Sequence, residues 1–176
     1  MAQTTGDLFQ IAYCTSLNLG WTELHLGNYE RAYTCYATGR QLFKELGIAV
    51  GRCSIGLLDA ASALQNYDEA LNHFRQSAQI CISYNQKVDL LELVVHWAES
   101  LERQGDDEHA LELITLALGH PSTPQFVCQE ANQLRLALQA KLPPDVFQKA
   151  QSYGQKLTIS EAVRGILGEG WLSDDF

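Results

Sequence analysis

The sequence has no long apolar run, and residues 1–10 lack the basic start and apolar stretch of a secretory signal. A membrane-spanning helix needs about 20 consecutive apolar residues, so we expect a cytoplasmic chain without a targeting segment. Proline is scarce, at 4 of 176 residues, while apolar residues make up 46% and charged residues 19%. This composition can fill the core of one globular unit and argues against disorder.

The cysteines lack the spacing of a metal site or of a disulfide framework. They are odd in number, scattered, and never form a CxxC pair: Cys14, Cys35, Cys53, Cys81 and Cys128. Cysteines with this distribution are expected to be reduced and to behave as small hydrophobic residues. Ligands from different helices could still converge, but without a local chelating pair we predict no metal, and we predict no cofactor.

Basic residues are few, and 12 Lys and Arg against 21 Asp and Glu give a net charge of -9. This balance argues against nucleic acid as a partner. The acidic excess lies in residues 61–120, which hold ten Asp and Glu against three Lys and Arg. Such a surface could attract a basic peptide, or the charges could simply occupy the solvated faces of helices.

A six-residue segment ending in alanine recurs without gaps, at Gly27–Ala32, Gln65–Ala70 and Gly105–Ala110. Four residues after each alanine stands a large apolar residue, at Tyr36, Phe74 and Ile114. This spacing is typical of neighbours on one helical face. A helical apolar pattern also precedes each segment, so each unit is predicted to be a helix, a tight turn and a helix. One such hairpin cannot bury its own apolar face, and stacking is therefore required.

The turn residues and the alanines have predicted local roles. Gly27 and Gly105 can adopt the left-handed geometry that ends a helix, and three polar side chains can cap the next helix: Asn28, Asn66 and Asp106. The alanines let the second helix approach the first closely, and the large residue one turn later fills the wider gap.

The unit resembles the tetratricopeptide repeat, because Gly20 and Ala98 stand seven residues before Gly27 and Gly105, where that family places a small residue. The middle copy departs, with Leu58 at the small position and Gln65 at the turn. The resemblance implies an all-α fold, a right-handed α-solenoid of about three hairpins plus capping helices. The expected hairpins are 7–46, 47–85 and 86–120 within residues 1–121, and residues 122–176 form C-terminal capping helices of the same structural unit.

Residues after His120 predict three further helices. Thr123 is expected as N-cap with Pro124 at the first helical position, followed by an apolar stripe of Phe126, Cys128, Ala131, Leu134 and Leu138. Pro143 and Pro144 break that helix, and residues 145–153 form a short one. Thr158 and Glu161 are spaced as a capping box that opens a final helix through Leu167.

This C-terminal part, over residues 47–167, resembles the end of bacterial signal-transduction ATPases of the STAND class. The resemblance rests on Ala110–Leu113 through His120–Pro121, Leu142–Phe147, Ala150, Gly154, Leu157 and Glu161–Val163. It implies the sensor portion of such a protein, detached from its NTPase, because the chain contains no GxxxxGK phosphate loop. The glycine cluster at 47–56 lacks the lysine.

No arrangement of residues predicts catalysis. His96 and Glu99 are three residues apart on one predicted helix, which is the spacing of a partly buried histidine with a carboxylate neighbour. Ser54, Ser62 and Ser77 lie in helical stretches without the strand-turn-helix elbow of a hydrolase. We therefore predict a module that is not an enzyme. An enzyme whose catalytic residues come from distant parts of the sequence is the alternative to this prediction.

The tetratricopeptide resemblance implies that the first helices of successive hairpins line a concave face that binds a protein or peptide. That face would present Leu17, Trp21, Leu24, His25, Arg52, Ile55, Asp59, Glu92, Val95, Glu99, Glu102 and Arg103. Trp21 could supply a dominant share of affinity there, or it could pack against neighbouring side chains. The mixed charge favours a basic or amphipathic segment. The alternative function is self-assembly into a homodimer through the ends of the stack.

Overall fold

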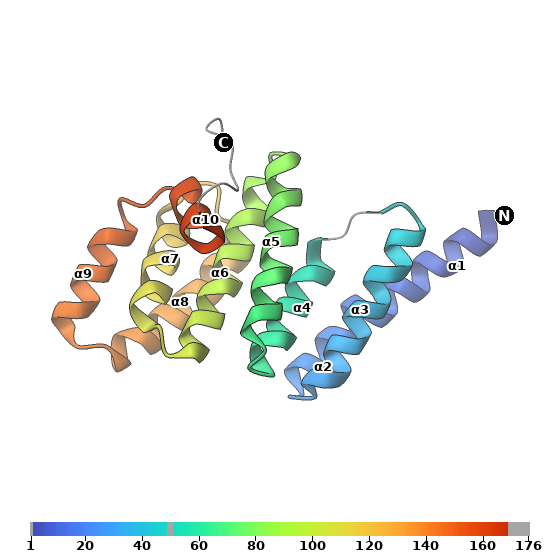
Figure 1. The fold of residues 1–176 in the computed structure, drawn as a ribbon, viewed down its shortest axis with the longest axis horizontal. Coiled ribbons are helices and arrows are strands. Elements are labelled where there is room, and N and C mark those ends of the chain that lie inside the picture. Colours follow the sequence, from blue (N-terminus) through green and yellow to red (C-terminus); the bar gives the residue numbers. More distant parts are fainter. Residues whose placement is uncertain (1, 49–50, 169–176) are drawn as a thin grey trace. The chain divides into compact units, whose positions relative to one another are not determined.

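The computed structural model describes residues 2–48 and 51–168, and every regular element within them is a helix. The all-α prediction is confirmed for this part of the chain. The first helical stretch runs without a break through α1 (Ala2–Tyr13), a π-helical segment η1 (Cys14–Gly20) and α2 (Trp21–His25). The remaining helices are α3 (Tyr29–Glu45), α4 (Gly51–Ala63), α5 (Tyr67–Ser83), α6 (Lys87–Gln104), α7 (Asp107–Gly119), α8 (Gln125–Lys141), α9 (Pro144–Gly154) and α10 (Ile159–Leu167) (Figure 1). Across the described ranges, no helix is both long and apolar enough to cross a membrane.

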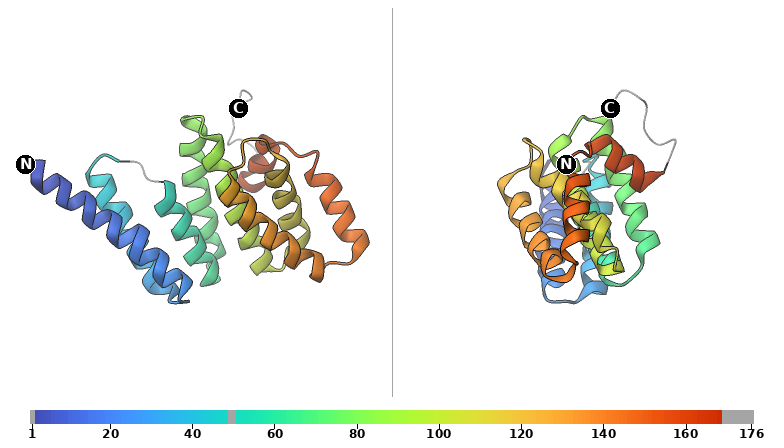
Figure 2. Two further views of the ribbon diagram at one scale, coloured as in Figure 1. Left: turned by 180° about the vertical axis from the view of Figure 1, so that it is seen from behind. Right: turned by 90° about the vertical axis from the view of Figure 1, so that its left-hand side faces the viewer.

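The chain divides into two compact units between Ser77 and Ala78, within α5. In the first unit, α3 packs against α1 and η1 and also against α4 (Figure 1). In the second unit, α7 contacts α6, α8 and α9, and α8 also contacts α6 and α9 (Figure 2). The right-handed solenoid and the division at residue 121 stay predictions.

The three turns identified from the sequence share one backbone geometry. Their central residues have positive φ angles of 79°, 60° and 82°, at Gly27, Gln65 and Gly105. In each turn the following amide donates to a carbonyl five residues back: Asn28 to Glu23, Asn66 to Ala61 and Asp106 to Leu101. This 6→1 bond, with a left-handed central residue, is the Schellman ending of a helix. The repeat in the sequence is therefore a repeat in backbone hydrogen bonding.

Side-chain capping at these turns was predicted wrongly for two of the three residues. Neither Asn28 nor Asp106 makes a side-chain cap. The Asn28 amide instead donates to Glu23 Oε2 at 2.7 Å, and the Asp106 carboxylate accepts from His109 Nδ1 at 2.8 Å. A charged neighbour offers a stronger hydrogen bond than a backbone amide that water can reach. Local spacing alone does not decide between these two partners.

Gln65 takes a conformation that suits glycine, and this predicts a stabilising substitution. A non-glycine residue in the left-handed region costs about 1 kcal/mol or more, part of which is offset because glycine has more freedom in the unfolded chain. We expect Gln65→Gly to raise the free energy of unfolding by about 0.5–1 kcal/mol in urea. Gln155→Gly is the matched control, since Gln155 ends α9 with φ at -64°. A gain of equal size at both sites would contradict the explanation.

The matched alanines occupy equivalent packed positions. Ala32, Ala70 and Ala110 are each 0% exposed, and each amide donates to the carbonyl of the residue four positions earlier, just after the turn. The large residues one turn later are also buried, at Tyr36, Phe74 and Ile114. The small residue next to a large one therefore performs the packing role that the spacing predicted.

Tyr36 shows how tightly the first unit is packed. A Cβ atom added to Gly20 would lie 3.3 Å from its ring, and one added to Gly56 would lie 2.2 Å from its Cζ. Leu57 and Ala60 join Tyr36 and Ala32 in one buried cluster. Because real Cβ contacts are not this short, glycine at position 56 is what lets the α4 backbone lie directly on the ring.

Helices α9 and α10 follow the predicted local signals. Lys141 ends α8, and Pro144 occupies a first-turn position of α9. Thr158 and Glu161 form the predicted capping box, with Thr158 N donating to Glu161 Oε2 at 2.8 Å. Near the end of α9, a Cβ on Gly154 would meet the backbone oxygen of Glu112 at 2.4 Å. Helix α9 therefore lies directly on α7, which positions the site described below.

Two predictions for α8 were wrong in detail. Pro124, not Thr123, is the N-cap, and the Thr123 hydroxyl donates back to the carbonyl of Ala117. Val127 is fully buried, whereas Phe126 is 42% exposed. The buried face of a helix depends on where its neighbours lie. Two adjacent apolar residues leave that choice to the tertiary structure.

Candidate functional site

Trp21 lies on the surface of the first unit. Its side chain is 55% exposed, and its ring lies 3.9 Å from the His25 ring, centroid to centroid. His25 Nδ1 also lies 2.9 Å from the Trp21 carbonyl oxygen. The i, i+4 pair thus presents two tilted aromatic rings in contact on one helix. Trp21 thus packs against a neighbouring side chain and keeps more than half of its own side chain exposed, and its role in binding stays a prediction.

The other predicted face residues of this unit are less accessible. Leu17 and Leu24 are half-buried, and Leu24 packs on the cluster around Tyr36. Ile55 and Asp59 are buried, at 8% and 7% exposed. The side chain of Arg52 lies outside the described residues. Among the predicted residues of this unit whose side chains the structure describes, Trp21 and His25 are the exposed ones.

In the second unit, the predicted face residues lie along α6. Val95 is fully buried, while Glu92, Glu99 and Glu102 are half-buried and Arg103 is exposed. Arg103 and Glu99 form an ion pair with Nη2 and Oε2 3.8 Å apart, and Glu102 accepts from Lys141 Nζ at 3.2 Å. Partly exposed pairs of this kind contribute little to stability. The twelve-residue face as a whole stays a prediction.

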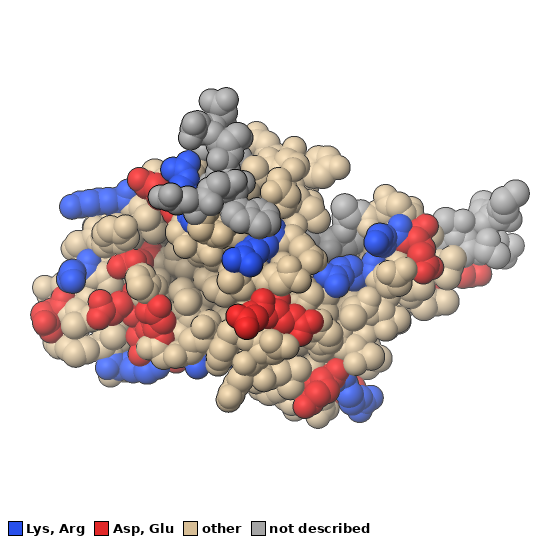
Figure 3. All heavy atoms as spheres, in the orientation of Figure 1, with Lys and Arg blue, Asp and Glu red and all other residues tan. Residues whose placement is uncertain are grey.

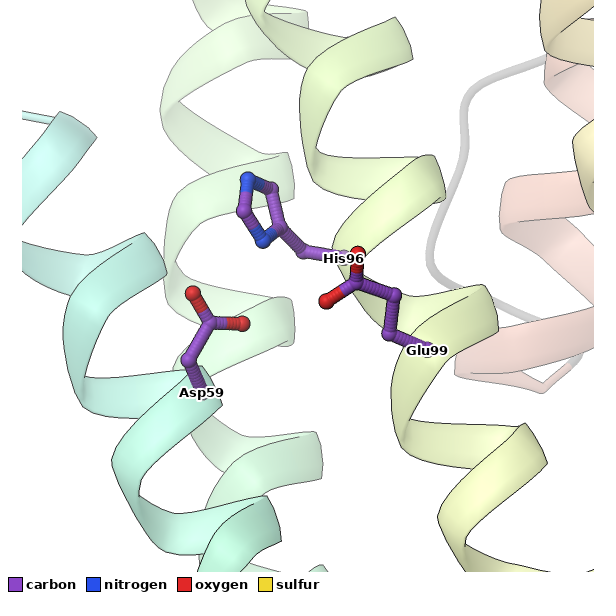
Figure 4. Close-up of side chains that lie close together, drawn as sticks. All are labelled: Asp59, His96 and Glu99. Carbon is purple, nitrogen blue, oxygen red and sulfur yellow. The ribbon is translucent and has the colours of Figure 1, made fainter. Parts of the chain in front are cut away.

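Figure 4 shows the side chains of His96 and Glu99 on α6, and that of Asp59 on α4 of the first unit. Both α6 residues are half-buried. The pair on α6 is therefore the neighbouring histidine and carboxylate that the sequence predicted.

A pocket that the sequence did not predict lies among α6, α7, α9 and α10 of the second unit, and we call it the α7–α10 pocket. Its volume is about 470 Å³, and its apolar lining comprises Trp97, Leu101, Leu113, Leu157, Ala162 and Ile166. The titratable lining residues are Asp106, His109, Glu112, Tyr153 and Glu161. Asp and Glu side chains gather on this side of the unit (Figure 3). No sequence signal marks the pocket, because its walls are up to 69 residues apart, from Trp97 to Ile166.

The carboxylates of the pocket differ in their surroundings. Asp106 accepts from His109, and this hydrogen bond raises the pKa of the imidazole. Glu161 is held by the Thr158 cap, which lowers the pKa of its carboxyl. Glu112 is half-buried, and burial raises the pKa of its carboxyl group. An ionised Glu112 is therefore poorly solvated, which makes it the carboxylate that gains most from a positive charge.

A chain of polar side chains crosses from α3 to α5 within the first unit. His73 is buried, and Arg40 Nη1 donates to its Nδ1 at 3.3 Å. His73 Nε2 lies 3.2 Å from Tyr33 Oη, and that hydroxyl donates to Glu69. Because Nδ1 accepts a hydrogen bond from Arg40, the imidazole is neutral and carries its proton on Nε2. Burial, followed by the charge of Arg40, lowers the pKa of His73 to about 4.

No disulfide links the five cysteines, and the prediction that all of them pack as small hydrophobic residues was wrong for Cys14, which is exposed. Cys53 and Cys81 are buried, and burial raises the pKa of both thiols, that of Cys81 to about 11. A buried thiol with a raised pKa stays protonated and unreactive. These two residues therefore serve as small core residues.

A family model described as Tetratricopeptide repeat matches residues 12–83. No curated protein matches the chain, and no solved structure matches it. Tetratricopeptide repeats generally mediate protein–protein interaction or scaffolding, and the family is typically non-catalytic. The resemblance to STAND-class proteins stays a prediction. We conclude that this is an all-α helical-repeat chain whose residues 12–83 match the tetratricopeptide repeat.

Proposed function

We propose that this chain is a non-catalytic, cytoplasmic module that binds a protein or peptide partner through its helical repeats. The observation that carries the proposal is the exposed aromatic pair of Trp21 and His25, within the segment that matches the tetratricopeptide repeat. A large aromatic side chain held rigidly at a surface loses little entropy when a partner covers it. The partner class is a basic or amphipathic segment, in keeping with the net charge of -9.

Peptide titration tests this proposal. We expect at least one peptide in a panel of basic and acidic amphipathic peptides to change the tryptophan fluorescence of the chain. We expect Trp21→Ala to weaken binding of that peptide by about tenfold or more, because truncating a central aromatic residue costs over 1 kcal/mol. Tyr13→Ala is the matched control, since Tyr13 is an exposed aromatic residue of the same helical stretch, 45% exposed.

Two results would count against the Trp21 surface. One is a fluorescence signal that no peptide of the panel changes. The other is an equal loss of affinity in Trp21→Ala and Tyr13→Ala, which would indicate a general effect of removing surface aromatics. Circular dichroism of both variants checks that each retains the helical fold.

The finer part of the proposal is that the module is the sensor or scaffold part of a bacterial STAND-type signalling protein. It rests on the resemblance over residues 47–167 and on the absence of a phosphate loop from this sequence. We expect the reading frame upstream to encode an NTPase with a GxxxxGK loop. An upstream frame without that loop would contradict this part and leave the binding role untouched.

Self-assembly is the second candidate, and the apolar surface of the first helical stretch favours it. Four large apolar side chains there are 38–53% exposed: Leu8, Phe9, Ile11 and Tyr13. Apolar surface of this kind is a common feature of contacts between copies. A dimer would give a mass twice that of the 19.6 kDa chain in light scattering, and a monomer at all concentrations would exclude it.

A further inference from the structure

The α7–α10 pocket combines an apolar floor with carboxylates and has no Lys or Arg in its lining. Leu113 and Ala162 are buried in the floor, and Trp97 is 7% exposed. The carboxylates stand on different elements: Asp106 before α7, Glu112 in α7 and Glu161 in α10. A ligand that fits such a site carries a positive charge on an apolar stem.

Glu112 is the group on which this fit depends. Among the described residues, no hydrogen bond or ion pair holds its carboxylate, whereas Asp106 is bonded to His109 and Glu161 to Thr158. His109 and, more weakly, Lys149 on α9 attract Glu112 electrostatically, whereas Glu108 and Asp106 repel it. A half-buried carboxylate without a hydrogen-bonding partner carries an unmet cost of desolvation. A cationic group that entered the pocket would offset that cost.

We infer that the α7–α10 pocket binds the side chain of an arginine or lysine presented by a protein partner. The methylene stem lies on Leu113 and Ala162, and the cationic head lies at Glu112. Long basic side chains bury their stems on apolar surface while the charged end finds an acceptor. Trp97 and Tyr153 also line the pocket, and aromatic side chains are residues to which cations are attracted.

Other ligand classes fit the pocket less well. A phosphate or an acidic side chain would meet three carboxylates, while the basic side chain of the lining, His109, is already hydrogen-bonded to Asp106. A purely apolar side chain would leave Glu112 desolvated and unpaired. Of these classes, the basic side chain is the one that can both cover the apolar lining and pair with the carboxylate of Glu112.

The inference rests on the proposed role in protein binding. Its site lies in the second unit, whereas Trp21 lies in the first. The test uses the full chain, labelled with ¹⁵N, and two capped tripeptides, acetyl-Ala-Arg-Ala-amide and its citrulline counterpart. Citrulline has nearly the shape of arginine without its charge. We expect the arginine peptide to shift amide signals of residues 106–113 and 157–166 and to bind about tenfold more tightly than the citrulline peptide.

Variants locate the effect within the pocket. We expect Glu112→Gln to bind the arginine peptide about tenfold more weakly, near the level of citrulline. Glu130→Gln is the matched control, because Glu130 is an exposed glutamate of the same unit, on α8, and does not line the pocket. The comparison of the two peptides on the unaltered chain needs no variant, so it holds even if a substitution impairs folding.

Three outcomes would overturn the inference. Equal binding of the arginine and citrulline peptides would remove the role of charge, and an equal loss in Glu112→Gln and Glu130→Gln would remove the role of the pocket. Shifts of the same amides on dilution of the chain alone would indicate that a second copy fills the pocket. Trp21→Ala separates the two proposals, since we expect it to leave the binding of the arginine tripeptide unchanged.

Discussion

Gly56→Ala is expected to destabilise the chain by about 2–3 kcal/mol, although alanine is the better helix former. In an open helical position, the same change would stabilise by up to about 1 kcal/mol. At position 56, the new methyl carbon would lie 2.2–2.5 Å from three ring carbons of Tyr36. The ring is 4% exposed and belongs to a buried cluster, so it cannot move aside without opening a gap. Overpacking therefore outweighs helix propensity, and urea unfolding measures the difference.

Gly6→Ala is the matched control for this prediction. Gly6 lies in α1 of the same unit, and a Cβ there meets nothing within 4 Å, so we expect a small gain in stability. The Tyr36→Leu background identifies the colliding partner, because the cost of Gly56→Ala should fall there by about 1 kcal/mol or more. An unchanged cost in that background would mean that another contact is responsible.

The second large effect is a loss of stability in mild acid, centred on His73. Its pKa is lowered to about 4 in the folded chain from the ordinary 6.5. The unfolded chain therefore binds the proton first as the pH falls. The stability that the neutral imidazole contributes is complete above pH 6.5 and is lost as the pH falls towards 4. The difference in pKa corresponds to about 3 kcal/mol.

Urea unfolding of the wild-type chain and of His73→Gln at pH 7.5 and 4.5 measures this effect. We expect the wild type to lose about 2–3 kcal/mol more than the variant between these pH values. The variant is also expected to be less stable at neutral pH, since Arg40 and Tyr33 lose the imidazole that joins them. The result that decides the prediction is the change with pH in each protein.

His25→Gln is the control for acid sensitivity, because His25 is exposed at the surface of the first unit. It should retain the wild-type dependence on pH. Parallel curves for the wild type and His73→Gln would show that carboxylates, not His73, govern the acid transition.

Features set by residues close in sequence were predictable. The turns at Gly27 and Gly105, the break at Pro143 and the box of Thr158 and Glu161 depend on backbone preferences over a few residues. The burial of the matched alanines was predictable for a related reason. Residues four positions apart lie on the same face of a helix, so each alanine and the large residue that follows it pack on the same side. The departure of Gln65 from glycine did not alter its turn, since the hydrogen bonds of the repeat impose a positive φ.

Features set by competition between partners were not predictable. The Asn28 side chain hydrogen-bonds Glu23 and does not cap the helix. Which of Phe126 and Val127 is buried depended on where α8 meets its neighbours. The link between Tyr33 and His73 was equally hidden, because 40 residues separate them. In each case, several partners satisfy the same local rule.

The sequence by itself determined that this chain is a set of helical repeats, where most of its helices begin and end, and which alanines are packed. Helix periodicity and turn conformation depend on residues a few positions apart, so the local sequence is enough to predict them. Only the tertiary structure decided that Trp21 is exposed, that His73 is buried in a polar chain, and that Glu112 faces a pocket. These properties depend on the solvent and charges that distant segments remove or supply, and no local pattern encodes them.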